Sequence, residues 1–244
     1  MRRDTHAGDR RGEQPDTCPD DSLAEYLSRF VTEERLARIL QVLSERTRYL
    51  TVVLEDIYQP HNASAVLRTC DAFGIQDVHV IENRNTYEIN RNVELGTAQW
   101  LTLRRYRDAA SNTETAVSEL RAAGYRIVAT SPHARQQSLE QFDLDAGPAA
   151  ILFGTEKEGL SQTALSLADE LVSIPMYGFV ESFNISVSAA LVLHQLTGRL
   201  RESGIDYSLS PRERAELYLH WLRGSISRVD ALEREYRDRE AGGG

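Results

Sequence analysis

Cysteine, histidine clusters and long apolar runs are all scarce in this sequence of 244 residues. Its two cysteines, Cys18 and Cys70, have no CxxC partner, and its six histidines have no metal-binding spacing, so we expect neither a disulfide framework nor a bound metal. No run approaches the roughly 18 apolar residues of a membrane span, and the charged N-terminus lacks the apolar segment of a signal peptide. These absences favour a cytoplasmic protein that does not enter a membrane.

Lysine is nearly absent as well, because Lys157 is the only lysine among 28 basic residues. The net charge of −9 is concentrated in residues 51–198, which carry 10 basic and 18 acidic groups. The flanks are balanced, with 9 basic and 10 acidic groups in residues 1–50 and 9 of each in residues 199–244. The forked guanidinium of arginine suits phosphate, so the flanks are candidates for binding RNA. A solvated surface of mixed charge explains the same counts.

Strand and helix patterns alternate between residues 50 and 198, which predicts an α/β domain with a mostly parallel sheet. The expected strands are 50–55, 77–82, 100–106, 126–131, 149–154 and 170–175. The expected helices are 62–73, 113–123, 161–168 and 184–200. Asn62 is a plausible N-cap of the first helix. The last helix is apolar on most sides, so we expect it to be buried.

Three further segments complete the predicted organisation. Residues 1–21 lack apolar periodicity and are expected to be a disordered tail. Residues 22–49 and 199–244 are expected to be helical extensions before and after the domain. Thr32 is expected to cap a helix in the first extension, and Pro211 to stand in the first turn of a helix in the second.

Three stretches of the domain have polar residues and glycines that a purely structural segment does not need. They are PHNASAVLRTCDAFG (60–74), ILFGTEKEGLS (151–161) and IPMYGFVESFNISVSAAL (174–191). Each follows or ends an expected strand. Ligands of parallel α/β sheets bind beyond the carboxyl ends of the strands. We therefore expect these loops to face one shared site.

Several common ligand-binding and catalytic motifs are absent from the sequence. The stretch GTEKEGLS has the glycine spacing of a phosphate loop, but Leu160 stands where that loop needs lysine. No G-x-G-x-x-G follows a strand, which disfavours a dinucleotide site, and there is no G-x-S-x-G nucleophile elbow.

The three stretches, in this order, resemble the three motifs of SPOUT methyltransferases. Asn62 and Arg68 resemble the first motif, FG-x-E-x-x-G (Phe153 to Gly159) the second, and IPM-x-G followed by S-x-N-x-S-x-S-x-A (Ser182 to Ala190) the third. The likeness covers residues 50–198. The amino-acid sequences of the motifs are most similar to those of the TrmH-type tRNA ribose methyltransferases. The short N-terminal extension also lacks the separate RNA-binding domain of ribosomal RNA relatives.

The resemblance implies a deep trefoil knot in the C-terminal part of the domain and a homodimer with its active site at the subunit interface. It implies that S-adenosylmethionine is the methyl donor and that tRNA is the acceptor, at the ribose 2′-hydroxyl of guanosine 18 in the D-loop. By likeness, the cofactor contacts are Thr130, Gly154, Glu156, Ile174, Met176, Gly178 and Phe183. The catalytic residues implied are Arg68, Asn62, Glu156, Ser182 and Asn184.

The resemblance makes Arg68 the activator of the 2′-hydroxyl. A guanidinium is a poor base at neutral pH, so stabilisation of the developing alkoxide and of a neighbouring phosphate is the easier role. Each candidate also has a plainer interpretation: Asn62, Ser182 and Asn184 as helix caps, and Glu156 as a solvated loop charge. Lys157 and Glu158 are expected to be solvated.

Three other functions remain open at this point. The first is the same chemistry on ribosomal RNA or on another tRNA nucleotide. A non-catalytic RNA-binding relative and a sensor of an adenosine ligand are the other two.

Overall fold

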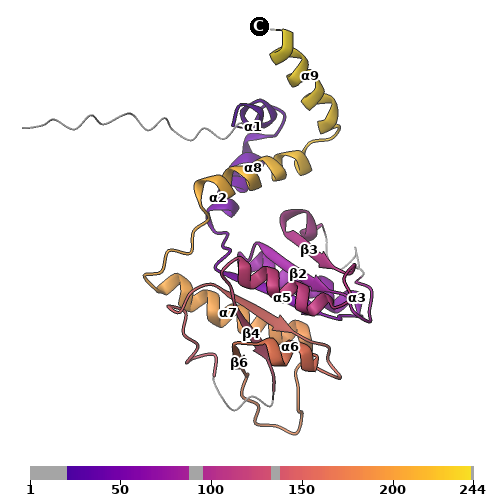
Figure 1. Cartoon of the computed structure of the whole chain (residues 1–244). Coiled ribbons are helices and arrows are strands. Elements are labelled where there is room, and N and C mark those ends of the chain that lie inside the picture. Colours follow the sequence, from indigo (N-terminus) through magenta and orange to yellow (C-terminus); the bar gives the residue numbers. More distant parts are fainter. Residues whose placement is uncertain (1–20, 88–95, 133–137, 243–244) are drawn as a thin grey trace, which may run out of the picture.

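The computed structural model describes residues 21–87, 96–132 and 138–242, so the predicted disordered tail lies almost entirely outside the described residues. Six strands in these ranges form one sheet in which every neighbouring pair is parallel, in the order β3-β2-β1-β5-β4-β6 (Figure 1). They are β1 (Leu50–Glu55), β2 (Asp77–Ile81), β3 (Thr102–Tyr106), β4 (Arg126–Thr130), β5 (Ala149–Phe153) and β6 (Glu170–Val172). The predicted α/β class with a parallel sheet is confirmed.

The central strands are buried on both faces, which explains their nearly continuous apolar runs. Every residue of β1, β2 and β5 is buried. The edge strand β3 exposes Arg104 and Arg105 instead. The predicted start of this strand was wrong, because Trp100 ends a 3-10 helix, η1 (Thr97–Trp100), and β3 begins at Thr102.

Helices cover both faces of the sheet. On one face α3 (Pro60–Ala72) packs beside α7 (Ile185–Glu202). On the other face lie α5 (Asn112–Ala122) and α6 (Gln162–Leu167). The core is therefore divided into two apolar layers by the sheet.

Two expectations about these helices were wrong. Asn62 is not an N-cap, because α3 begins at Pro60 and Gln59 is the capping residue. Proline suits the first turn of a helix, so α3 begins two residues earlier in the chain than predicted. The helix α7 is not buried all round, since Val187 and Leu191 are 43% and 41% exposed. These two residues lie one turn apart on a face away from the core.

The remaining helices form a separate group, which we call the helical module: α1 (Asp21–Ser28), α2 (Glu33–Ser44), α8 (Pro211–Ser225) and α9 (Val229–Gly242) (Figure 1). Their apolar side chains form two small clusters of their own. Thr32 caps α2 and Pro211 opens α8, as predicted. A capping box of Ser210 and Glu213 was not anticipated. No helix in the described ranges is long and apolar enough to cross a membrane.

Candidate functional site

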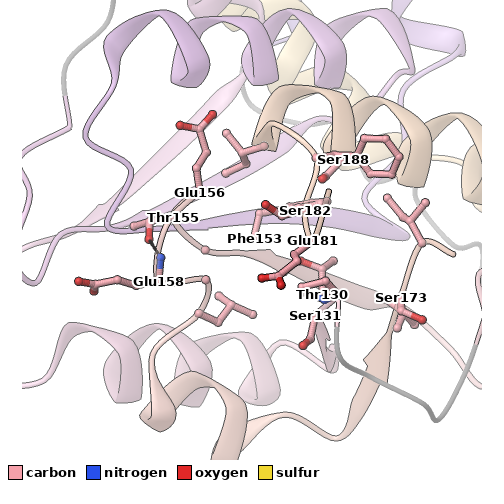
Figure 2. A pocket seen from close by; sticks show the side chains of 18 of the residues that line it. Thr130, Ser131, Phe153, Thr155, Glu156, Glu158, Ser173, Glu181, Ser182 and Ser188 are labelled. Carbon is pink, nitrogen blue, oxygen red and sulfur yellow. Dashed lines mark hydrogen bonds between the residues drawn. The ribbon is translucent and has the colours of Figure 1, made fainter. Parts of the chain in front are cut away.

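The carboxyl ends of the strands carry a cavity of about 350 Å³, as the parallel topology predicts (Figure 2). Its walls are the loops after β4, β5 and β6 together with the first turns of α7. The lining includes Thr130 to Pro132, Gly154 to Leu160, Ser173, Ile174, Met176, Glu181 to Phe183 and Ser188. Three segments that are distant in the sequence therefore enclose one space.

One residue from each of the three motif stretches meets the other two at this cavity. The Nδ2 atoms of Asn62 and Asn184 both donate hydrogen bonds to Oε1 of Glu156, the former at 2.8 Å. Asn184 Nδ2 also lies 3.2 Å from Asn62 Oδ1. We call these three residues the Asn–Glu–Asn cluster. Its amides fix the position of the Glu156 carboxylate, which lines the cavity.

Each asparagine is itself held by its helix. Asn184 is the N-cap of α7, and its Oδ1 accepts a hydrogen bond of 2.8 Å from the backbone N–H of Ser186. Asn62 is 4% exposed, and its Nδ2 donates to Gln59 Oε1 at 2.8 Å. The capping interpretation of Asn184 is therefore correct, but the same side chain also reaches Glu156.

The loop after β5 closes on itself, and its glycines make this possible. Backbone hydrogen bonds of 3.0 and 2.9 Å join Thr155 and Gly159 in both directions. A Cβ atom on Gly154 would lie 2.1 Å from the carbonyl carbon of Gly159, far inside van der Waals contact. Gly159 has φ +69°, in the left-handed region that favours glycine. The spacing of the second motif thus encodes a tight loop that presents Glu156.

Two buried acidic residues at the end of β1 support this loop, and sequence reasoning missed both. The Glu55 carboxylate accepts hydrogen bonds of 2.8 Å from the N–H and the hydroxyl of Ser161, the N-cap of α6. Thr113 donates to it at 2.7 Å from α5. The only signal in the sequence is an acidic residue at the end of an otherwise apolar strand.

Asp56 connects the same strand end to a second loop. Its backbone has φ 55°, and its Oδ1 accepts the backbone N–H groups of Asn83 and Arg84 at 2.7 and 2.8 Å. Arg84 then forms an ion pair of 2.7 Å with Glu158 on the cavity loop. Glu158 is exposed, as expected, but it is not merely solvated.

Six of the seven residues predicted to contact a cofactor line the cavity, namely Thr130, Gly154, Glu156, Ile174, Met176 and Phe183. Gly178 does not line it and lies on an exposed part of the loop after β6. The hydroxyl of Thr130 donates to the Leu152 carbonyl at 2.8 Å, so it joins β4 to β5. Of the predicted catalytic residues, Ser182 also lines the cavity, as Figure 2 shows.

Arg68 is a predicted catalytic residue that does not join this arrangement within one chain. It stands on α3, six residues after Asn62, and its side chain is exposed. Six residues of α-helix turn the chain by roughly 600°, so the two side chains leave the helix about 120° apart. Arg68 is not among the described residues that line the cavity.

The charges around the cavity favour a cationic ligand. Glu156, Glu158 and Glu181 contribute carboxylates to the lining, and Lys157 is the single basic residue among the lining residues described. Carboxylates in a partly enclosed space attract positive charge. Within the described ranges, no group of three or more histidine, cysteine, aspartate or glutamate side chains is arranged to hold a metal ion.

Comparison with known proteins agrees with this geometry. The SpoU rRNA methylase family matches residues 49–194. A tRNA (guanosine(18)-2′-O)-methyltransferase of Borreliella burgdorferi is 46% identical over 207 residues, which cover 85% of this chain and 93% of that protein. The crystal structure of the TrmH/SpoU tRNA modifying enzyme of A. aeolicus has a TM-score of 0.71 at 28% identity, covering 80% of this chain and 98% of that one.

A further solved structure contains a ligand. The SpoU methyltransferase AviRb of Streptomyces viridochromogenes, in complex with the cofactor AdoMet, has a TM-score of 0.54 at 27% identity and covers 68% of this chain and 63% of its own. The resemblance seen in the three motifs is thereby confirmed over most of the chain. The protein belongs to the SpoU rRNA methylase family.

Proposed function

We propose that this protein transfers a methyl group from S-adenosylmethionine to the ribose 2′-hydroxyl of guanosine 18 in the D-loop of tRNA. The observation that carries this proposal is the Asn–Glu–Asn cluster, which unites the three motif stretches beside a cavity of small-molecule size. The choice of tRNA and of guanosine 18 is supported by the likeness to the Borreliella burgdorferi enzyme, which extends along nearly the whole of that protein.

The cavity has the properties that this cofactor requires. Its volume falls in the range of about 300–1,000 Å³ that is typical of small-ligand pockets. Ile174, Met176 and Phe183 supply apolar surface for a nucleoside, and the carboxylates of Glu156 and Glu181 suit a cation. S-adenosylmethionine, when bound, supplies a methyl group on a positively charged sulfur. The residues of the cavity fit that group, and no metal is required.

The chain's own residues then have to align and activate the acceptor. Glu156, held by two asparagine amides, presents a fixed negative charge. Ser182 lines the cavity shortly before α7, and Asn184, the N-cap of that helix, helps to hold Glu156. Positioning of the 2′-hydroxyl in line with the methyl group accounts for a large part of the rate enhancement in such displacements. Arg68 stabilises the negative charge that develops on the 2′-oxygen, because a guanidinium stays protonated at neutral pH.

A second copy of the chain completes the site in this proposal. The loop after β6 exposes Tyr177 almost fully, at 97%, and Phe179 and Val180 are exposed beside it. On α7, Val187 and Leu191 are exposed as well. Large exposed apolar patches mark interaction surfaces. A homodimer through this surface covers it and brings Arg68 of one protomer toward a cavity, which the single chain does not do.

The proposal extends to the rest of the chain. Residues 50–198 form the catalytic domain, and its C-terminal part is threaded as a deep trefoil knot, as the motif resemblance implies. The extensions 22–49 and 199–244 hold the RNA, and the protein acts in the cytoplasm. The likeness to the A. aeolicus enzyme, which includes 80% of this chain, supports this organisation.

Transfer of labelled methyl groups to RNA tests the proposed function. The purified chain is incubated with labelled S-adenosylmethionine and either unmodified tRNA transcript or protein-free ribosomal RNA. We expect incorporation into the tRNA transcript, and none when its guanosine 18 is replaced by the 2′-deoxy nucleotide. Incorporation into ribosomal RNA alone would move the same chemistry to another substrate. Binding of tRNA without incorporation into either RNA would make the protein a non-catalytic binder.

A further inference from the structure

A second cavity, of about 520 Å³, lies where the helical module meets the sheet domain. Its walls come from α2, the C-terminal end of α3, η1, the C-terminal end of α7 and α8, and none of the predicted site residues lines it. We call it the Arg–Trp cleft, because four arginines and two tryptophans stand in its walls: Arg35, Arg38, Arg46, Arg201, Trp100 and Trp221. Such a combination of cations and aromatic rings needs an explanation in a chain whose net charge is −9.

The aromatic wall of the Arg–Trp cleft contains both tryptophans of the chain. Their ring centroids are 5.9 Å apart with an interplanar angle of 88°. Trp221 is almost fully buried, whereas Trp100 is half-buried. The Arg35 guanidinium stands 5.7 Å from the centroid of the Trp100 ring. The cleft thus combines an aromatic ring with a cation placed over that ring.

The charge of the Arg–Trp cleft is only partly neutralised. Asp71 pairs with Arg46, and Glu45 lies 3.9 Å from Arg201. Arg35 and Arg38 have no carboxylate partner among the described residues, and Arg38 donates to the neutral Gln41 at 2.9 Å. The cleft therefore retains two positive charges at its rim.

Two buried donors in the walls of the cleft lack an acceptor within the described part of the chain. They are Nε of Arg46 and Nε1 of Trp221, in side chains that are each 1% exposed. Buried polar groups in native proteins are usually satisfied. These two donors belong to neighbouring side chains, since the Arg46 guanidinium lies 5.3 Å from the centroid of the Trp221 ring.

Most other arginines of the flanking segments form ion pairs or hydrogen bonds within the protein, although Arg214 and Arg228 form no ion pair among the described residues. Arg223 and Arg237 both pair with Glu233, and Arg239 pairs with Glu235. Arg48 joins Asp77 and Glu213. The prediction that the flanks bind RNA therefore applies best to the few arginines that pair with no carboxylate. Two of these, Arg35 and Arg38, stand at the rim of the Arg–Trp cleft.

We propose that the Arg–Trp cleft binds one nucleotide of the tRNA other than the one that is methylated. Its base stacks on Trp100, and Arg35 and Arg38 hold its phosphate. Stacking of unpaired bases on aromatic rings beside cations is the usual way in which proteins hold single-stranded RNA. The inference rests on the proposed function, because tRNA is the polyanion that the enzyme has to hold.

The distance between the cleft and the Asn–Glu–Asn cluster fits one RNA molecule that occupies both. Asn62 lies near the start of α3, and Asp71, near its end, lines the cleft. Nine residues of α-helix span about 14 Å at a rise of 1.5 Å per residue. Arg68 lies between them on the exposed side of the same helix. The cleft therefore sets where the tRNA body rests when its ribose enters the site.

The first test is the double variant Arg35→Ala and Arg38→Ala, compared with Arg214→Ala and Arg234→Ala. The control pair removes the same charge from exposed positions of the helical module outside the cleft. We expect KM for tRNA to rise at least tenfold in the cleft variant, with kcat at saturating tRNA within twofold of wild type. We expect less than a twofold change in the control. Equal effects of the two variants would overturn the proposal.

The second test uses intrinsic fluorescence, because both tryptophans report on the cleft alone. Unmodified tRNA transcript should quench their emission saturably in wild type and in Arg68→Ala, but not in the cleft variant. Binding of tRNA, measured independently by filter retention, without any change in emission would refute the stacking. Quenching without methyl transfer would instead count against the proposed function, so the two failures are distinguishable.

Discussion

Arg68 is the residue on which the proposed chemistry depends most, and its exposed position makes it easy to test. Replacement by alanine should leave the melting temperature unchanged, because the side chain is not part of the core. We expect kcat/KM for tRNA to fall at least about a hundredfold, the usual loss when a group that stabilises developing negative charge is removed. Arg68→Lys keeps the positive charge but loses the planar guanidinium that can donate two parallel hydrogen bonds. It should therefore recover only part of the activity. Full activity of Arg68→Ala would exclude a catalytic role.

His79 gives the protein a specific sensitivity to acid. It is buried in β2 with its Nδ1 atom 3.0 Å from the hydroxyl of Tyr106, and desolvation lowers its pKa to about 4. The unfolded chain takes up this proton near pH 6.5, so between pH 6.5 and 4 acidification favours unfolding. Since one pKa unit corresponds to about 1.4 kcal/mol, the contribution approaches about 3 kcal/mol.

Urea unfolding at several pH values measures this contribution. The variant His79→Gln keeps a polar group near Tyr106 but has no proton to take up. The free energy of unfolding should fall less steeply in the variant than in wild type between pH 6.5 and 4. Parallel pH dependences of the two proteins would show that His79 is not held neutral in the folded state.

Sequence reasoning identified the residues of the Asn–Glu–Asn cluster but not their support. Asn62, Glu156 and Asn184 could be found because each stands at a fixed position in a motif. Glu55 could not, because its partners Thr113 and Ser161 are 58 and 106 residues away and no spacing connects them. The predicted N-cap role of Asn62 was wrong because the proline two residues before it determines where α3 begins.

At the scale of elements, the loop after β5 depends on Gly154 more than on Gly159. An alanine at Gly154 would place Cβ 2.1 Å from backbone atoms, which cannot move without opening the loop. An alanine at Gly159 meets nothing within 4 Å and costs only the left-handed backbone strain, roughly 1–2 kcal/mol. We expect Gly154→Ala to weaken S-adenosylmethionine binding at least tenfold in calorimetry, and Gly159→Ala to weaken it much less. Equal affinities in the two variants would contradict this account of the loop.

Local patterns predicted the order and type of the elements well, because central parallel strands and amphipathic helices leave strong signals. They failed where the outcome depends on tertiary packing. The helix α7 has the composition of a buried helix, yet Val187 and Leu191 face away from the core of the chain. By contrast, the predicted cap at Thr32 is correct, because it begins α2 and separates it from α1.

At the scale of the whole molecule, the exposed face of α7 predicts the assembly state. The double variant Val187→Glu and Leu191→Glu places two charges in the proposed dimer surface and should yield monomers in analytical ultracentrifugation. Leu40→Glu is the matched control, because Leu40 is 52% exposed on α2, outside that surface. We expect the monomeric variant to lose methyltransferase activity while its melting temperature stays near that of the control. A dimer that persists in the double variant would place the interface elsewhere.

The identity of the methylated nucleotide tests the central claim most directly. Unmodified tRNA transcript is treated with the enzyme and S-adenosylmethionine, digested, and mapped by mass spectrometry of its oligonucleotides and nucleosides. The account predicts one new methyl group, on the ribose 2′-oxygen of guanosine 18 in the D-loop. A methyl group on a base, or on the ribose of a different nucleotide, would contradict it.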